Sequence, residues 1–73
     1  MILFVCSIHN NMLGACREVK SYEEGAILIK KLAQEQLGRP LDDDELKDLD
    51  AYYFIFNNED MDNTYCWSIG IVE

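Results

Sequence analysis

The strongest helical signal in the chain is the stretch SYEEGAILIKKLAQEQLG, residues 21–38. Ser21 and Glu24 fit the capping box, in which the serine hydroxyl accepts a hydrogen bond from the Glu24 amide and the glutamate reaches back. The apolar side chains of the stretch recur at helical spacing and therefore share one face. Gly38 suits a left-handed C-cap, and a proline two residues later prevents continuation. The stretch predicts one amphipathic helix over residues 22–37.

A hairpin is predicted before this helix. Residues 2–8 are almost continuously apolar, which is typical of a strand buried on both faces or nearly so. Asn10 and Asn11 tolerate the left-handed backbone of a two-residue turn, so the chain is expected to pair back on itself. This register pairs Ile8 with Leu13, Cys6 with Ala15, Phe4 with Arg17 and Ile2 with Val19. The core face that it predicts comprises Ile2, Phe4, Cys6, Ile8, Leu13, Ala15 and Val19.

The sequence after the long helix predicts a short acidic helix and a second hairpin. Asp42 is a suitable N-cap for a helix that runs to about residue 49, with Glu45 at the capping-box position. Residues 51–57 have high β-propensity and predict a strand, which a polar turn follows. Residues 64–72 alternate between two faces, as expected of the partner strand.

The order strand, strand, helix, strand, strand predicts an α+β two-layer sandwich. The 73 residues are too few to divide into two cores, so we expect a single domain over residues 1–73. We expect a four-stranded, mostly antiparallel sheet with the long helix across one face and the short acidic helix before the third strand. One helix covers only one face of such a sheet. The other face must be polar, covered by the short helix, or docked on a partner.

Composition excludes several classes of protein. Six Lys and Arg against fourteen Asp and Glu give a net charge of −8, which leaves no basic surface for direct binding of nucleic-acid phosphates. No apolar run reaches the roughly 18–20 residues that cross a bilayer. No basic segment precedes the apolar first residues, as a signal peptide would require. We therefore expect neither nucleic acid nor a membrane as a direct partner.

Three cysteines, Cys6, Cys16 and Cys66, are an odd number in a sequence without an export signal. Disulfide-stabilised secreted domains use even sets at higher density. We therefore expect reduced thiols, buried as small core residues, in a cytoplasmic protein. No Cys-x-x-Cys pair accompanies the single histidine, His9, so these residues are not expected to form a metal site.

The negative charge is concentrated in the second half of the chain. Residues 1–39 carry five basic and four acidic side chains, whereas residues 40–73 carry one basic and ten acidic side chains. Two acidic clusters, residues 42–50 and 59–62, are expected at opposite ends of the third strand, which is about 23 Å long. Such a surface either keeps the protein in solution or recognises a basic groove. The candidate partner-binding residues are Asp42, Asp43, Asp44, Glu45, Asp48, Glu59, Asp60 and Asp62, with the aromatic neighbours Tyr52 and Tyr53.

No motif predicts a cofactor or a catalytic centre. Asp60-x-Asp62-x-Thr64 begins like an EF-hand loop, but the sixth and twelfth positions are Tyr and Ile instead of Gly and Glu. The sequence contains no glycine-rich phosphate loop, no G-x-S-x-G elbow and no H-E-x-x-H pair. His9 is predicted at a turn, where nothing prepares it as a catalytic base. We therefore expect no enzymatic activity, no metal and no cofactor.

Taken together, these features predict a non-enzymatic acidic protein that occupies the basic nucleic-acid-binding surface of another protein. Such a protein would inhibit a host defence or nucleic-acid-processing protein. In size and acidity the chain is similar in character to small phage-encoded inhibitors, among them anti-CRISPR and anti-restriction proteins; no motif carries this likeness, and no residue is assigned by it. The alternatives are a toxin-neutralising immunity protein and a small homodimeric structural or assembly protein.

Overall fold

The computed structural model describes residues 2–60 and 62–73, apart from the side chains of Ala15, Glu59 and Asp60. Within these residues the chain forms two helices and a four-stranded sheet with the strand order β2-β1-β4-β3. The elements are β1 (Ile2–His9), β2 (Met12–Val19), α1 (Tyr22–Leu37), α2 (Asp43–Tyr52), β3 (Phe54–Asp60) and β4 (Asn63–Val72). Neighbouring strands are antiparallel. The expected α+β class, with a mostly antiparallel sheet and two helices, is confirmed.

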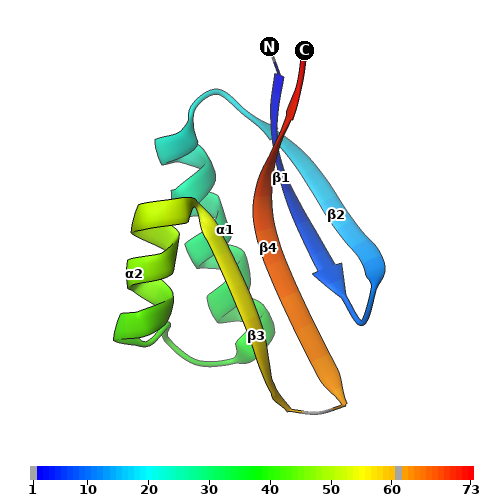
Figure 1. The fold of residues 1–73 in the computed structure, drawn as a ribbon, viewed down its shortest axis with the longest axis vertical. Coiled ribbons are helices and arrows are strands. Elements are labelled where there is room, and N and C mark those ends of the chain that lie inside the picture. The colour runs from blue at the N-terminus through cyan, green and yellow to red at the C-terminus, as the bar shows by residue number, and fades with distance from the viewer. Residues whose placement is uncertain (1, 61) are drawn as a thin grey trace.

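Both helices lie on one side of the sheet (Figure 1). Helix α1 packs mainly on the central strands β1 and β4, and α2 packs on the edge strand β3. The short helix therefore extends the layer formed by the long helix, and it does not cover the opposite face. None of the helices in the described part of the chain is both long and apolar enough to span a membrane.

The first hairpin has the predicted turn but a different register. Asn10 and Asn11 adopt left-handed φ values of 50° and 66°, and Ile8 pairs with Leu13 as expected. The register then shifts by one residue, and Gly14 is the additional residue on β2. This shift is typical of a β-bulge, for which glycine in a strand is a common signal.

The predicted core face is wrong because β1 turns its odd-numbered side chains toward the helices, and the one-residue shift brings Val19 of β2 to that same side, opposite Leu3. Cys6 pairs with Cys16 rather than with Ala15. The buried residues of β1 are Leu3, Val5 and Ser7. Of the predicted core face, Ile2, Phe4, Cys6, Ile8 and Leu13 lie on the side away from the helices, Val19 is buried, and the side chain of Ala15 lies outside the described residues.

Helix α1 has the predicted bounds and caps. The Ser21 hydroxyl accepts from the Glu24 amide at 3.1 Å, and Gly38 closes the helix with φ 70°. The Glu24 carboxylate reaches back one residue further than the capping box requires, to the Lys20 amide at 3.2 Å. Gly25 is buried against β4, where an added Cβ would lie 2.5 Å from Cδ1 of Ile69. The absence of a side chain there allows the helix to approach the sheet closely.

Helix α2 is longer than expected, and β3 begins later. The sequence predicted a strand from residue 51, but the helix continues through Tyr52 and the strand starts at Phe54. Leu49 is buried, and its carbonyl accepts from the Tyr53 amide at 3.0 Å. Tyr53 closes the helix with a left-handed φ of 54° and packs on the Tyr22 ring of α1. Packing of α2 on the core therefore overrides the local β-propensity.

The core lies between the sheet and the two helices. Trp67 of β4 is fully buried at its centre, and its indole N–H donates to Gln36 Oε1 of α1 at 2.9 Å. The buried apolar residues are Leu3, Val5, Val19, Ile29, Ala33, Leu41, Leu49, Ile55 and Trp67. Each of the six elements contributes at least one of them, and Leu41 comes from the connection between α1 and α2. The core therefore depends on the whole described chain.

Candidate functional site

The outer side of α2 presents the densest exposed negative charge among the described side chains. Asp43, Asp44, Asp48 and Asp50 are exposed there, and Lys47 is the single basic residue of the helix. We call these four aspartates the acidic face. Asp42 is also exposed, but its carboxylate already accepts from the Glu45 amide at 2.8 Å as the N-cap. It contributes charge to the surface while its position is fixed by the helix.

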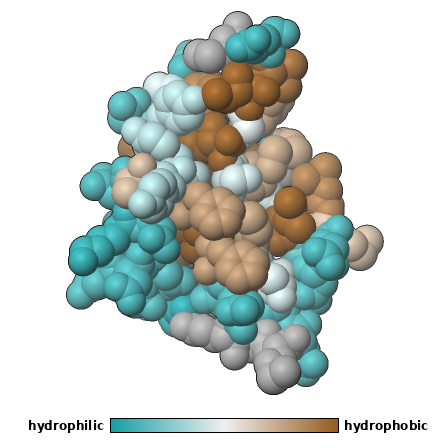
Figure 2. Space-filling view, viewed as in Figure 1, coloured by the Kyte–Doolittle hydropathy of each residue, from teal (hydrophilic) through white to brown (hydrophobic). Residues whose placement is uncertain are grey.

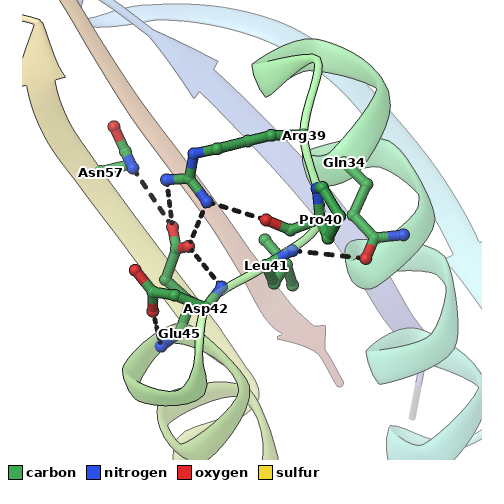
Figure 3. Close-up of polar contacts among 7 residues, drawn as sticks. All are labelled: Gln34, Arg39, Pro40, Leu41, Asp42, Glu45 and Asn57. Carbon is green, nitrogen blue, oxygen red and sulfur yellow. Dashed lines mark hydrogen bonds and ion pairs between the residues drawn. The ribbon is translucent and has the colours of Figure 1, made fainter.

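Glu45 is buried and belongs to the interior rather than to the acidic face. Arg39 Nη1 lies 2.8 Å from one carboxylate oxygen and also donates to the Pro40 carbonyl at 2.9 Å (Figure 3). The Asp42 amide donates to the same oxygen at 3.1 Å, and Asn57 Nδ2 donates to the other at 3.2 Å. Of the predicted partner-binding residues, Glu45 is thus placed in the interior, with both carboxylate oxygens bonded within the fold.

The environment of Glu45 favours its charged form. Burial acts in the opposite direction, because it penalises the carboxylate. Hydrogen bonds from Arg39, from the Asp42 backbone and from Asn57, together with the charge of Arg39, outweigh this penalty and lower the pKa of Glu45 below 4.5. The ion pair joins the connection between the two helices to the first turn of α2, and the hydrogen bond from Asn57 joins that turn to β3.

The two acidic clusters do not lie as the sequence predicted. Helix α2 leads directly into β3 and runs antiparallel to it, so the first turn of α2 reaches Asn57, at the middle of the strand. The cluster of residues 42–50 therefore extends along the strand instead of remaining at its entry (Figure 1). In the second cluster, Asp62 is exposed, and the side chains of Glu59 and Asp60 lie outside the described residues.

The turn that carries Asp62 is bonded to the turn of the first hairpin. Asn10 Nδ2 donates to the Asp62 carbonyl at 3.0 Å. The backbones of Asn10 and Thr64 are bonded at 2.9 Å, and the Thr64 amide donates to the Asn10 side chain at 2.7 Å. His9 Nε2 lies 2.8 Å from Asn63 Oδ1. The position of Asp62 is thus fixed by residues more than fifty positions earlier in the chain.

The aromatic candidates divide between surface and core. Tyr52 is 74% exposed beside the acidic face, whereas Tyr53 is partly covered by Tyr22. His9, Tyr65 and Trp67 form a continuous stack with centroid distances of 4.4 and 5.4 Å. His9 therefore has a packing role at the end of the sheet. Among the described residues, no group of three or more His, Cys, Asp or Glu side chains is placed to hold a metal ion.

Sequence reasoning missed a second surface, the side of the sheet away from the helices, which we call the open face. Residues paired directly across antiparallel strands point to the same side. The pairing places there Ile2, Phe4, Cys6, Ile8, Leu13, Cys16, Phe54, Phe56, Cys66, Gly70 and Val72, with the polar residues Glu18 and Ser68. Figure 2 shows apolar side chains gathered over the strands and bordered by hydrophilic ones. Gly14, the bulge residue, was the sequence signal that could have revealed it.

Two of the three cysteines meet on the open face. The sulfur atoms of Cys6 and Cys16 lie 2.9 Å apart. The expectation of buried thiols is wrong for Cys16, which is exposed, while Cys6 and Cys66 are half-buried. Burial raises the pKa of Cys66, and burial followed by the interactions with Cys16 raises the pKa of Cys6 to about 11.

Neither a protein-family model nor a curated protein nor a solved structure matches this chain significantly, so the inference of its function rests on the acidic face and the open face.

Proposed function

We propose that this chain is a non-enzymatic binding protein whose acidic face engages a basic surface on another protein. The observation that carries the proposal is the group of four exposed aspartates on one short, capped helix, with a single lysine among them. Tyr52, exposed at the end of the same helix, provides an aromatic anchor of the kind that is enriched at protein interfaces.

The fold supports recognition by a preformed surface. The N-cap Asp42 and the ion pair of Glu45 with Arg39 hold α2 in place, so binding does not require the helix to be ordered first. Complementary charge raises the rate of encounter and selects a basic partner. Surfaces that hold nucleic acid are basic. We infer that the partner is a nucleic-acid-binding protein, of a host defence or nucleic-acid-processing system, and that the chain inhibits it by occupying its groove.

We expect the double variant Asp44→Lys/Asp48→Lys to bind the partner at least roughly tenfold more weakly than the wild type. The two lysines would repel the basic partner that the two aspartates attract. Wild-type binding is expected to weaken as salt is raised, since salt screens exposed charges. The partner is isolated from the native cell extract with the immobilised chain at low and high salt, and its affinity is then measured with purified components.

The matched control is Glu23→Lys/Glu35→Lys on α1, because it changes the net charge by the same amount on another helix. Both glutamates are exposed. This control is expected to bind nearly as well as the wild type, and far-UV circular dichroism should show that both variants are folded. Equal affinities of the wild type and the α2 variant would refute the proposal, and equal losses in both variants would reduce it to an effect of net charge. A nuclease toxin as the captured partner would identify the chain as an immunity protein.

The open face favours a second candidate, a homodimeric structural or assembly protein. Leu13, Phe56 and Val72 on this face are each more than half exposed. The molecule measures 35 × 26 × 17 Å, so its broad side has an outline of about 900 Å² at most. Stable interfaces bury about 800 Å² on each partner. This outline is an upper limit on the area of the open face, so a stable dimer would have to pack the two open faces together over most of their extent.

This candidate predicts a mass of two 8.5 kDa chains in size-exclusion chromatography with light scattering, without dependence on salt. Phe56→Asp is expected to give a monomer, because it places a charge in an apolar contact. The control Ile27→Asp changes an apolar residue on the outer side of α1 that is 72% exposed, against 52% for Phe56, and it is expected to leave the dimer intact. A wild-type chain that elutes as a monomer at every concentration would exclude this candidate.

A further inference from the structure

Two thiols on the open face are placed for reaction with each other. Cys6 of β1 and Cys16 of β2 are directly opposed across the strand pair, and their sulfur atoms lie 2.9 Å apart. A disulfide bond is about 2.05 Å long and joins residues whose Cα atoms lie about 4.4–6.8 Å apart. Directly opposed residues of antiparallel strands have Cα separations of about 4.5–5.5 Å. The backbone therefore already satisfies the requirement for a cross-strand disulfide.

Cys66 also lies on the open face, but it is too far from Cys6 and Cys16 to form a disulfide with either. It pairs with Ile8, two residues along β1 from Cys6. Such diagonal neighbours lie about 7–8 Å apart, beyond the usual reach of a disulfide. Cys66 and Cys16 are separated by the whole width of β1 and are offset along it, which puts them more than about 9–10 Å apart. Of the three pairs that these cysteines can form, Cys6–Cys16 is the one that fits.

The two sulfur atoms are open to small reagents. Cys16 is exposed, and both cysteines line a hollow of the open face together with Phe4, Gly70 and Val72. Nothing lies within 4 Å of the position that a Cβ on Gly70 would occupy, so the hollow is not obstructed there. A molecule in this hollow approaches the sulfur pair from solvent without any change in the sheet.

The exposure of the two thiols indicates the order of reaction. Cys6 is half-buried, and burial, followed by the hydrogen bond with Cys16 and its charge, raises the pKa of Cys6 to about 11. The thiolate is the form that attacks a disulfide. Cys16, the exposed thiol, is therefore the first to meet an oxidant, and Cys6 is the resolving thiol behind it.

We propose that Cys6 and Cys16 form a reversible redox site that exchanges with low-molecular-weight disulfides of the glutathione class. Cys16 loses its proton and attacks one sulfur of the reagent, which forms a mixed disulfide and releases one reagent thiolate. Cys6 then loses its proton and attacks the Cys16 sulfur, which releases the second thiolate. Two protein thiols are oxidised by two electrons, and one reagent disulfide becomes two thiols that take up the two protons.

The disulfide would tie the edge strand β2 to β1 next to the register shift at Ser7, where the ladder is irregular. It changes the open face and leaves the acidic face of α2 untouched. The site is therefore independent of the binding proposed for the acidic face, and either one can fail without the other.

The three single Cys→Ser variants test this site, because each leaves one of the three pairs. The reduced proteins are incubated with oxidised glutathione, quenched with acid and alkylated, and the free thiols are counted by mass spectrometry. We expect the wild type to fall from three free thiols to one, and Cys66→Ser to fall from two to none, both without bound glutathione. Cys6→Ser and Cys16→Ser are expected to retain their thiols or to accumulate glutathione adducts.

The wild type alone also reports which pair forms, so the test does not depend on the folding of a variant. Trypsin cleavage after Arg17 releases a peptide of residues 1–17 that contains Cys6 and Cys16 but not Cys66. Loss of two hydrogens in this peptide, reversed by dithiothreitol, is the expected result. A wild type that keeps three thiols, holds a lasting glutathione adduct, or links Cys66 or a second chain would overturn the proposal.

Discussion

Replacing Trp67 by alanine is expected to lower the free energy of unfolding by about 3–5 kcal/mol. The Trp67 side chain is fully buried between the sheet and α1, and its ring stacks on Tyr65 at a centroid distance of 5.4 Å. Its indole N–H also donates to Gln36 at 2.9 Å. A domain of this length has a total stability of roughly 4–11 kcal/mol. The variant is therefore expected to lose about a quarter or more of its stability, and all of it if the total is at the lower end of this range.

Urea unfolding should be followed by far-UV circular dichroism and not by tryptophan fluorescence. Trp67 is the only tryptophan, so its removal also removes the fluorescence probe. The matched control Gln36→Ala deletes only the hydrogen bond from α1 and is expected to cost about 1 kcal/mol. A Trp67→Ala protein that unfolds at nearly the urea concentration of the wild type would show that the ring is not at the centre of the core.

Arg39→Ala is expected to destabilise the protein by about 2 kcal/mol at neutral pH. Removing one partner of a buried ion pair costs about 3–5 kcal/mol, because the other charge is left uncompensated. The Glu45 side chain is 10% exposed, but that of Arg39 is 32% exposed, and solvent screening at its guanidinium reduces the loss. Thermal or urea unfolding measures the effect. Lys31→Ala, on the outer side of α1, is the control and should change stability by less than about 0.5 kcal/mol.

The same ion pair predicts how stability depends on pH. Because the folded protein holds the pKa of Glu45 below 4.5, the stabilisation that the charged Glu45 gives the fold is fully present above pH 4.5. As the pH falls below that value, the unfolded chain takes up the proton first, and the stabilisation is lost through the folded pKa. Glu45→Gln should therefore lose less stability than the wild type in acid. Parallel acid dependences of the two proteins would contradict the assigned role of the pair.

The sequence was sufficient where local interactions decide the structure. The bounds of α1 follow from Ser21, Glu24 and Gly38, which act within a few residues of themselves. The asparagine turn at residues 10 and 11 is likewise decided by its own backbone preferences. In both places the competing conformations differ in interactions that neighbouring residues make, so no distant contact was needed to choose between them.

The sequence was insufficient where a distant contact chooses between two acceptable patterns. Both sides of β1 are apolar, so either could have faced the helices; the pairing of Ser7 with the buried Trp67 of β4 puts the odd-numbered side on the core. Residues 51 and 52 suit a strand, but the packing of Leu49 and Tyr53 keeps them helical. These outcomes depend on partners that lie far away in the sequence.

The candidate site divides in the same way. Composition located the acidic half of the chain, and the exposure of Asp43, Asp44 and Asp48 agrees with a charged surface on α2. Composition could not distinguish Glu45 from these residues, because its burial depends on Arg39 and Asn57. The open face was predicted as core for the same reason, since apolar residues show which side chains avoid water but not which layer covers them.

The place of β1 in the sheet has a consequence for how the chain folds. β1 is the first strand of the sequence, yet it lies between β2 and β4, the last strand. The first hairpin closes a short loop and forms early, whereas the pairing of Ile2 with Val72 closes a loop of nearly the whole chain. During translation, the edge of β1 that pairs with β4 stays unpaired until β4 emerges from the ribosome. Folding is therefore expected to complete only after synthesis of β4, in one late and cooperative step.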